Sequence, residues 1–527
     1  MLFHAWVIVF SVLIVSCTGG KSPVPQQQPL ATELPAMRPA EPVLAAKPVA
    51  SDSIRIRFLK LADEGLTVSV TTPGDDDGQT TFSNRSCCGL GSVQDFIADV
   101  RVTSDAGDLH AIRSRAGWTV RHRPGLMLTV TYRLPRSGET TIDSGIRDQV
   151  RPIVHNGAFH LIGDTALLLP VRGAPSDRIE LDVDAQGVAD QAHFVSSFGL
   201  GSLHGVVIPK SQVVKALYLG GRIDLEVRDT PRGRVGIAYS GMAPSFHRAR
   251  TDQDILAILD AERGFFADSQ PWYLVSVRGG RRIDPQINLG GGMGLTDSFA
   301  MFARSDLDMS NAEQAEQFRW VLAHEYFHHW NGLALRVASL PGTDRDDVAT
   351  YWFSEGVTEF YTMRLLTRGG LQGPDRSLVI LNKKLSMYAA NDKRNLGAKA
   401  AAATFWKSKD SEQIPYLRGY IAAWYADLAI RRATHGERDL DQMMRALVLR
   451  AKAQPEFRVD NDFLVQYLAR DLPEDEGRRF RSFILDGGAG PLTEDSFAPC
   501  LYGQRTPPEQ VLQFHPPDAD RSDCFRH

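Results

Sequence analysis

The chain is poor in cysteine and has no excess of positive charge. Its 527 residues include five cysteines, and no two of them have the C-x-x-C spacing of a cysteine zinc site. The 59 basic and 63 acidic residues give a formal net charge of −4, and no basic stripe interrupts the sequence. Because nucleic-acid-binding proteins normally carry such a stripe, the sequence predicts no nucleic acid partner.

Long apolar runs are also missing. Residues 5–15 are apolar apart from Ser11, a length too short for a membrane-spanning helix, which needs roughly 20 residues, but suited to a secretory signal. Residues 14–17 (IVSC) are similar to a bacterial lipobox, so we predict a lipoprotein signal peptide at 1–17 and lipidation of Cys17. A plain signal peptide or a misplaced start is the alternative, because the first residues contain no Lys or Arg. The predicted location is the bacterial envelope, facing the periplasm, with membrane contact only through this anchor.

Two further segments, one near each end of the chain, have biased compositions. Residues 18–51 are rich in Pro, Gln and Ala, which is typical of a linker. Residues 491–527 form a Pro-rich tail, which a disulfide between Cys500 and Cys524 could close, worth roughly 3 kcal/mol for such a loop. The remaining adjacent pair, Cys87 and Cys88, could be half-cystines, a vicinal bridge or buried thiols.

The first half of the chain has the pattern of an antiparallel β domain, which we place at residues 52–240. Residues 54–58, 66–70 and 128–132 alternate between apolar and polar side chains, as half-buried strands do. Clusters of Gly, Asp and Pro, such as residues 73–78, separate these runs as turns. Either a sandwich or a saddle of sheets fits this pattern.

The second half, residues 241–490, is mainly helical. A helix is expected over 253–266, a strand over 272–277, and long helices between 310 and about 485. The sequence therefore predicts an α+β multidomain protein, with the chemistry concentrated in the helical half.

One predicted helix has the pattern of a zinc site. It starts at the capping-box residues 310–313 and extends to His328. His324 and His328 are four residues apart and lie on one helix face, where two imidazoles can bind one Zn²⁺. Glu325 lies beside them and could accept a proton from an attacking water. The alternative is a surface helix with an incidental pair of histidines.

A second predicted helix, over residues 351–368, offers the third ligand. Glu355 and Glu359 are four residues apart on a largely apolar face, where an unpaired carboxylate is costly to bury. We assign Glu355 to the metal, which gives one zinc ion per chain with three protein ligands. Glu359 is expected either to orient a ligand histidine from the second layer or to face solvent.

The residues around these positions resemble a known family. Residues 324–331 (HEYFHHWN) and 352–358 (WFSEGVT) are similar to the glycyl aminopeptidases, gluzincins that often carry a PDZ domain and are distantly related to aminopeptidase N. Residues 415–419 (PYLRG), followed by 427–431 and 439–441, match as well. The resemblance implies a thermolysin-like catalytic domain behind the β domain. It also implies that Tyr416 donates a hydrogen bond to the tetrahedral oxyanion, unless that tyrosine only packs in the core.

Two departures limit what the resemblance implies. The tail after residue 490 is too short for a PDZ domain, whose absence we therefore expect. The family has a glutamate for the substrate amino group on an edge strand, whereas residues 290–298 (GGGMGLTDS) contain none. Asp297 could substitute for it, and Arg418 replaces a lysine of the family with its charge retained. We expect the substrate backbone to contact Gly291, Gly292, Met293 and Gly294.

Zinc-dependent hydrolysis of peptides is the predicted function, by an exopeptidase similar to aminopeptidases. An endopeptidase or oligopeptidase that ignores the N-terminus is one alternative. An inactive binding or assembly protein of the envelope on a peptidase scaffold is the other.

Overall fold

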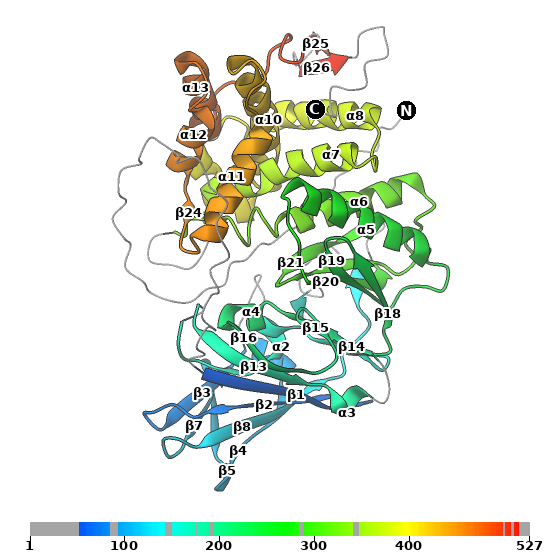
Figure 1. The fold of residues 1–527 in the computed structure, drawn as a ribbon, viewed down its shortest axis with the longest axis vertical. Helices are drawn as coiled ribbons and strands as arrows, with labels where there is room; N and C mark the ends of the chain where they lie inside the picture. Colours follow the sequence, from blue (N-terminus) through cyan, green and yellow to red (C-terminus); the bar gives the residue numbers. More distant parts are fainter. Residues whose placement is uncertain are drawn as a thin grey trace.

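The computed structural model places the β-rich part of the chain at one end of the molecule and the helices at the other (Figure 1). It describes residues 52–84, 93–142, 150–174, 176–189, 193–283, 289–340, 347–498, 501–506 and 511–515. The predicted signal peptide, the linker and the cysteines at 17, 87, 88, 500 and 524 lie outside these ranges. No helix of the described ranges has the length and apolarity needed to span a membrane.

A seven-stranded sheet with the order β16-β13-β1-β2-β8-β4-β5 forms the outer layer. Its strands are β1 (Asp52–Ala62), β2 (Gly65–Pro73), β4 (Ala98–Ser104), β5 (Gly107–Leu109), β8 (Met127–Pro135), β13 (Arg178–Asp184) and β16 (Leu203–Pro209). Only β1 and β13 run parallel among its paired strands. Ile54, Ile56 and Phe58 are buried, while Arg55 and Arg57 between them are exposed. The strands predicted from alternation are confirmed, and each is longer than its prediction.

Two smaller sheets complete the β-rich end. The four-stranded sheet contains β3 (Gln79–Ser83), β6 (Ala111–Ser114), β7 (Gly117–Arg121) and β12 (Leu169–Pro170). The five-stranded sheet contains β10 (Ile153–His155), β11 (Ala158–Ile162), β14 (His193–Ser196), β15 (Gly199–Leu200) and β17 (Leu217–Gly221). Phe58 of β1 packs on Phe159 and Phe194, with ring centroids 5.4 and 5.2 Å away. The outer sheet and the five-stranded sheet therefore face each other across an aromatic layer.

A six-stranded sheet joins the two ends of the molecule. It contains β9 (Thr141–Ile142), β18 (Asp224–Thr230), β19 (Gly233–Ser240), β20 (Trp272–Arg282), β21 (Leu289–Leu295) and β22 (Ser298–Arg304). One face packs on helices and the other on the five-stranded sheet, so the centre of β20 is buried on both sides. Since β9, β18 and β19 precede residue 241, this sheet crosses the predicted domain boundary.

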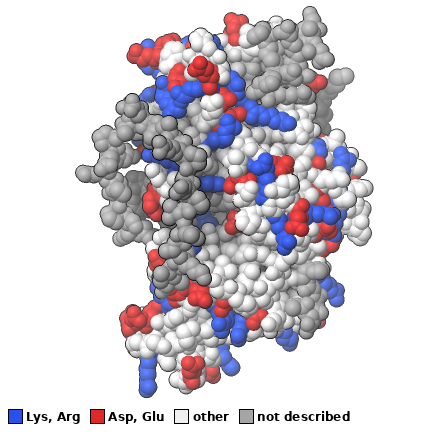
Figure 2. All heavy atoms as spheres, viewed as in Figure 1, with Lys and Arg blue, Asp and Glu red and all other residues white. Residues whose placement is uncertain are grey.

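The helices beyond this sheet carry the candidate site. They are α5 (Arg248–Phe265), α6 (Ala312–Phe327), α7 (Thr358–Arg368), α8 (Pro374–Ala390), α9 (Ala398–Thr404), α10 (Lys409–Ala433), α11 (Leu440–Ala453), α12 (Asn461–Ala469) and α13 (Glu474–Arg481). This arrangement confirms the predicted α+β class. On the face shown in Figure 2, basic and acidic side chains are interspersed over the parts that are not grey.

The C-terminal tail contains structure that its composition did not predict. Strands β25 (Tyr502–Thr506) and β26 (Val511–His515) form a hairpin that packs on α8. The backbone of Phe514 exchanges two hydrogen bonds with the side chain of Asn382, each 2.8 Å long. The Phe514 ring is fully buried and lies 4.5 Å from that of Phe497. The tail therefore supports the helix on which it packs.

Candidate metal centre and active site

Helix α6 carries both predicted histidine ligands. Its N-cap is Asn311, whose side chain accepts hydrogen bonds from the N–H groups of Glu313 and Gln314. The predicted capping box starting at Ser310 was therefore wrong by one residue, because the amide of Asn311 caps the helix instead. The helix ends at Phe327, and His328 is its C-cap.

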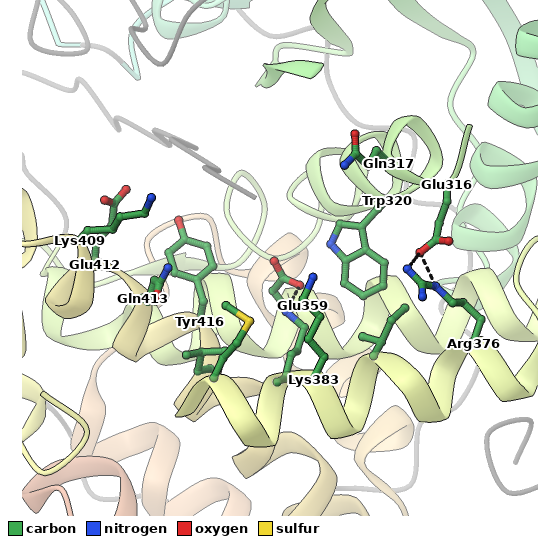
Figure 3. A pocket seen from close by; sticks show the side chains of 14 residues that line it. Glu316, Gln317, Trp320, Glu359, Arg376, Lys383, Lys409, Glu412, Gln413 and Tyr416 are labelled. Atoms are coloured by element: carbon green, nitrogen blue, oxygen red, sulfur yellow. Dashed lines mark hydrogen bonds and ion pairs between the residues drawn. The ribbon is translucent and has the colours of Figure 1, made fainter. Parts of the chain in front are cut away.

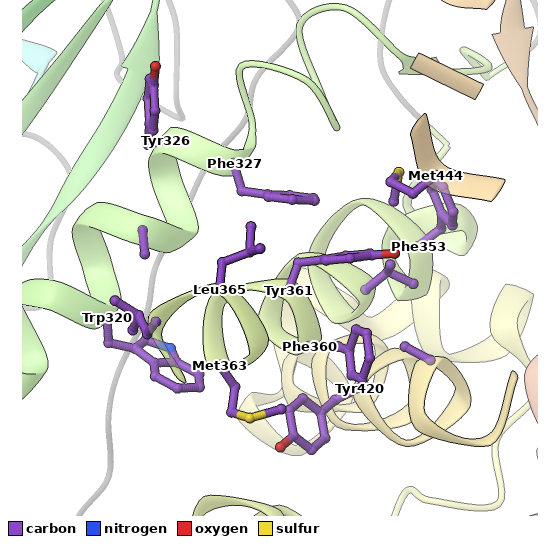
Figure 4. Packing of buried hydrophobic residues seen from close by; sticks show 14 of the residues in the cluster. Trp320, Tyr326, Phe327, Phe353, Phe360, Tyr361, Met363, Leu365, Tyr420 and Met444 are labelled. Carbon is purple, nitrogen blue, oxygen red and sulfur yellow. The ribbon is translucent and has the colours of Figure 1, made fainter. Parts of the chain in front are cut away.

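An aromatic core fixes α6 against α7. The Phe327 and Tyr361 rings are stacked with centroids 4.9 Å apart and an interplanar angle of 12° (Figure 4). On the neighbouring side, the Trp330 ring stacks 4.5 Å from that of Phe266. Large buried aromatic pairs of this kind hold their helices in one register. The positions of the histidines relative to α7 are set by this packing.

Glu355 lies in a π-helical turn, η3 (Trp352–Val357), that precedes α7. The sequence predicted one continuous helix here and did not reveal the wider turn. Such turns are frequent at functional sites because they change the direction of a side chain within a helix. In this structure the turn lets Glu355 join the histidines of α6.

Two glycines let η3 approach α10 closely. A Cβ atom on Gly419 would lie 1.8 Å from the carbonyl oxygen of Trp352, and one on Gly356 would lie 2.5 Å from the Cα of Gly419. No larger residue fits at either position without a shift of the backbone. The glycine of the PYLRG segment is therefore needed to place α10 beside the turn that carries Glu355.

The structure brings His324, His328 and Glu355 together in a buried cluster. Nε2 of His324 lies 3.1 Å from Nε2 of His328, and Oε2 of Glu355 lies 3.3 and 3.4 Å from these two atoms. Zinc bonds of about 2.0–2.2 Å in a tetrahedron place ligand atoms about 3.3–3.6 Å apart, close to these distances. Within the described ranges this is the one group of three or more such side chains with metal-ligand spacing. The three donors therefore fit zinc.

A hydrogen bond behind the cluster occupies Nδ1 of His328 and leaves its Nε2, which faces the cluster, available to bind a metal. Nδ1 of His328 lies 3.0 Å from the carbonyl oxygen of Asn331, which can only accept, so Nδ1 carries a proton. The amide of Asn331 in turn donates to the Phe353 carbonyl and to Oγ1 of Thr358. In the sequence, Asn331 was noted only as part of the segment 324–331 that resembles the family. Its role in orienting His328 was missed, because that role depends on the neighbouring helix.

Glu359 lies behind His324 and is not exposed to solvent. It is 3% exposed, and its Oε1 lies 3.7 Å from Nδ1 of His324. Its Oε2 accepts a hydrogen bond of 2.8 Å from Nζ of Lys384 on α8. The alternative of a solvent-facing Glu359 was wrong. No local motif indicated Lys384, since it comes from a different helix.

The two carboxylates of the site are equally buried, but their pKa values are shifted in opposite directions. Burial raises the pKa of Glu355, but His328 and His324 outweigh it and lower the pKa to about 2. Burial raises the pKa of Glu325 to about 8, with His328 opposing the shift and Glu355 adding to it. A cation held by the three donors would lower this second pKa. Glu355 is thus suited to bind a cation, and Glu325 to accept a proton.

Tyr416 of α10 lies next to the cluster, with its ring centroid 6.4 Å from that of His324. It is buried, and burial together with the charge of Glu355 raises its pKa well above 10. The phenol therefore keeps its proton and can donate a hydrogen bond. Arg418, in contrast, donates to the backbone carbonyls of Ile484, Arg394 and Leu396. The charged guanidinium of Arg418 therefore connects α10 to the segments that contain these three carbonyl groups.

Strand β21 forms the edge of the six-stranded sheet beside α6. A Cβ atom on Gly292 would lie 2.3 Å from the ring of Phe299 and 3.2 Å from Cγ of Glu325. The strand, which includes Gly291, Met293 and Gly294, therefore passes close to the proposed base. Asp297 lies in the turn after it, where burial raises its pKa to about 6 and its charged neighbours are Arg263 and Asp268. Those neighbours are not members of the cluster, so the geometry gives Asp297 no role there.

The segments 427–431 and 439–441 contribute a buried ionic network. Asp427 accepts from Arg364 at 2.8 Å and from Arg431 at 3.1 Å. Asp441 accepts from Arg368 at 2.6 Å and lies 3.4 Å from Arg364. The network ties α7, which continues the turn of Glu355, to α10 and α11.

Comparisons with known proteins agree with this geometry. Residues 317–425 match the model of the M61 glycyl aminopeptidase family, and this stretch includes the cluster, Glu325 and Tyr416. The match confirms the predicted resemblance over this part of the chain. No curated protein matches the chain in sequence.

Solved structures were compared with this one, and one of them shares its fold. An aminopeptidase N family protein from Idiomarina loihiensis superimposes with a TM-score of 0.69 and 17% identity, over 86% of this chain and 79% of that one. An M1 zinc metallopeptidase from Deinococcus radiodurans gives a TM-score of 0.48 and 14% identity, over 83% and 94%. At 17% identity, the similarity to the Idiomarina protein shows a shared fold, which agrees with the α+β architecture described above.

Proposed function

We propose that this protein is a zinc-dependent peptidase with one zinc ion per chain. The observation that carries the proposal is the spacing of the three buried donor atoms, 3.1 to 3.4 Å apart, beside the carboxylate of Glu325. His324, His328 and Glu355 would hold the metal. When bound, zinc supplies Lewis acidity, which brings the pKa of a coordinated water to about 7 and polarises a carbonyl group.

The residues around the metal position have complementary roles in this proposal. Glu325 accepts a proton from the attacking water and delivers one to the leaving amine. Tyr416 donates a hydrogen bond to the carbonyl oxygen as that oxygen becomes negative. Glu359 and Asn331 hold the two histidines in orientation from behind. The edge strand β21 offers its backbone to an extended peptide beside Glu325.

Metal analysis combined with a Glu325→Gln variant tests this proposal. We expect one zinc per chain in both proteins and a loss of peptidase activity of about 10²–10⁴-fold in the variant. Removal of the metal by a chelator should lower the melting temperature of both proteins, because zinc binds only the folded site. Purified protein with neither zinc nor activity would instead support an inactive binding protein of the envelope.

The family match favours an aminopeptidase-like exopeptidase. One observation favours the second candidate, an endopeptidase or oligopeptidase: β21 has the sequence LGGGMGL and offers no carboxylate for a substrate amino group. Rates on free and N-acetylated forms of the same peptide separate the two. An aminopeptidase should lose nearly all activity on acetylation, whereas equal rates would establish the second candidate.

We also propose export with a lipid anchor at Cys17, on the basis of residues 1–17 alone. Metabolic labelling with a fatty acid should mark the wild-type protein. A Cys17→Ala variant should remain unlabelled and leave the membrane fraction.

A further inference from the structure

A pocket opens next to the proposed active site, between α6, α7, α8 and α10. Glu359 and Tyr416 belong to its wall and also lie against the ligand His324. In Figure 3 these two side chains lie between Lys409 on one side and Trp320 on the other. A group held in this pocket would therefore adjoin the bond being cleaved.

The inner wall of the pocket is apolar and its outer wall is cationic. Trp320, Ile380 and Leu417 line it and are 6%, 8% and 2% exposed, so they form its floor. Lys383 on α8 and Lys409 at the start of α10 are exposed and form its rim. This arrangement suits a ligand with a short aliphatic part and a charged end.

Two of the pocket's carboxylates already have basic partners. The pocket is lined by four basic and three acidic residues, and two ion pairs form among them. Glu359 accepts from Lys384 at 2.8 Å, and Glu316 accepts from Arg376 at 2.7 Å. These pairs fix the walls, and neither of them includes Lys383 or Lys409.

Of the acidic residues that line the pocket, Glu412 is the one outside these two ion pairs. Glu412 lies one helical turn from Lys409, and among the described residues no carboxylate is within ion-pair distance of Lys383 or Lys409. Partial burial, and then the charges of Lys384 and Arg376, lower the pKa of Lys383, while Glu316 and Glu313 oppose this shift. Lys383 therefore has two basic neighbours, Lys384 and Arg376, and an anion held beside it would offset their repulsion.

We propose that this pocket binds a carboxylate of the substrate peptide, with Lys383 and Lys409 as its specificity-determining residues. The proposal rests on the proposed peptidase function and defines its substrate class. The carboxylate is either the C-terminus of a short peptide or the side chain of an Asp or Glu near the cleaved bond. The apolar floor would contact the methylene groups that precede it.

Four peptides and two double variants test the proposal. Gly-Ala-Ala is compared as free acid and as amide, and Gly-Ala-Glu amide is compared with Gly-Ala-Gln amide. The ratio of kcat/KM within each pair is measured for the zinc-loaded wild type, for Lys383→Ala/Lys409→Ala, and for Lys399→Ala/Lys407→Ala. The last variant is the matched control, since it removes two exposed lysines of α9 and η4 (Phe405–Lys407) that do not line the pocket.

We expect wild type to favour the carboxylate in at least one pair by about two- to fivefold, the range for a partly exposed charge contact. The first pair reports a C-terminal carboxylate and the second a side-chain carboxylate. The ratio should fall towards one in the rim variant and persist in the control. A ratio near one for both pairs in wild type, or one that persists in the rim variant, would overturn the proposal.

Binding to a zinc-loaded Glu325→Gln protein separates this proposal from the function on which it rests. Calorimetric titration with the same four peptides should show the same preference for the carboxylate in Kd. If wild type cleaves no peptide while this preference remains and depends on the rim lysines, the peptidase proposal fails and the pocket assignment holds. If peptides are cleaved but Kd does not distinguish the members of each pair, the pocket assignment fails and the peptidase proposal holds.

Discussion

At the scale of residues, the buried histidines and glutamates of the site stabilise one another, because each provides a partner for the next. His324, His328, Glu355 and Glu359 are all 3% exposed or less, and burying so many ionisable groups is costly without strong partners. Each histidine has one ring nitrogen directed at the cluster and the other near a group behind it. This is the arrangement by which proteins fix metal-binding imidazoles.

Replacing Tyr416 by phenylalanine should reduce the rate without affecting the metal. The phenol would stabilise negative charge that exists only during the reaction, so kcat should fall by about 10²–10³-fold with a much smaller change in KM. Zinc content should remain at the wild-type value. Tyr420→Phe is the control, because this ring lies one turn further along α10 against Phe360. Equal losses of activity in both variants would show that Tyr416 acts only through packing.

Replacing Glu359 by glutamine should weaken zinc binding. The change removes the negative charge behind His324 and the ionic partner of Lys384 while preserving size. Loss of such an outer partner typically costs 10–100-fold in metal affinity. The affinity is measured by competition with a chromophoric chelator. Glu316→Gln, which lines the same pocket but pairs with Arg376, should bind zinc as wild type does.

At the scale of elements, patterns that depend on one segment predicted the structure well. The alternating residues of β1, β2 and β8 and the histidine spacing of α6 could be recognised without knowledge of the rest of the chain. Features that depend on contacts between two distant segments could not be predicted in this way. The π-helical turn of Glu355 and the hairpin β25–β26 are stabilised by α10 and α8, which lie far from them in sequence.

The contact of η3 with α10 gives a prediction at this scale. Gly419→Ala should destabilise the protein by about 1–3 kcal/mol, because the added Cβ would meet the carbonyl of Trp352 at 1.8 Å. Activity should fall as well, since the turn carrying Glu355 must move. Chemical denaturation at 25 °C measures the change in stability, and the rate of peptide hydrolysis measures the change in activity. Gly477→Ala in α13 is the control, because its nearest neighbour would be 3.6 Å away. That substitution should be neutral or slightly stabilising.

At the scale of the whole molecule, three layers position the site. The six-stranded sheet has the β-rich end on one face and α5 and α6 on the other, and its edge strand β21 passes beside Glu325. On the far side of α6, α7 is tied to α10 and α11 by the buried ionic network. The sequence patterns of the two halves predicted a β-rich part and a helical part. They did not predict that strands before residue 241 belong to the central sheet.

The buried network should make stability depend on pH in a defined direction. Burial raises the pKa of Asp427, but Arg364 and Arg431 outweigh it, so the pKa in the folded state is below its ordinary value. A carboxyl group with a lowered folded pKa contributes stability above its unfolded pKa of about 3.9, and the contribution is lost as pH falls through the folded pKa. The unfolding free energy of wild type should therefore decrease with falling pH below about pH 4.

An Asp427→Asn variant isolates this contribution. At pH 7 it should be less stable by about 3–5 kcal/mol, because Arg364 loses its closest buried partner. Below pH 4 its stability should fall less steeply than that of wild type, since one fewer proton is taken up on unfolding. Asp462→Asn, which removes an exposed partner of Arg481, should retain the wild-type slope. If the slopes for Asp427→Asn and wild type coincide, then Asp427 is not the group that couples the helices to pH. The stability of the helical end would then depend on its apolar packing alone.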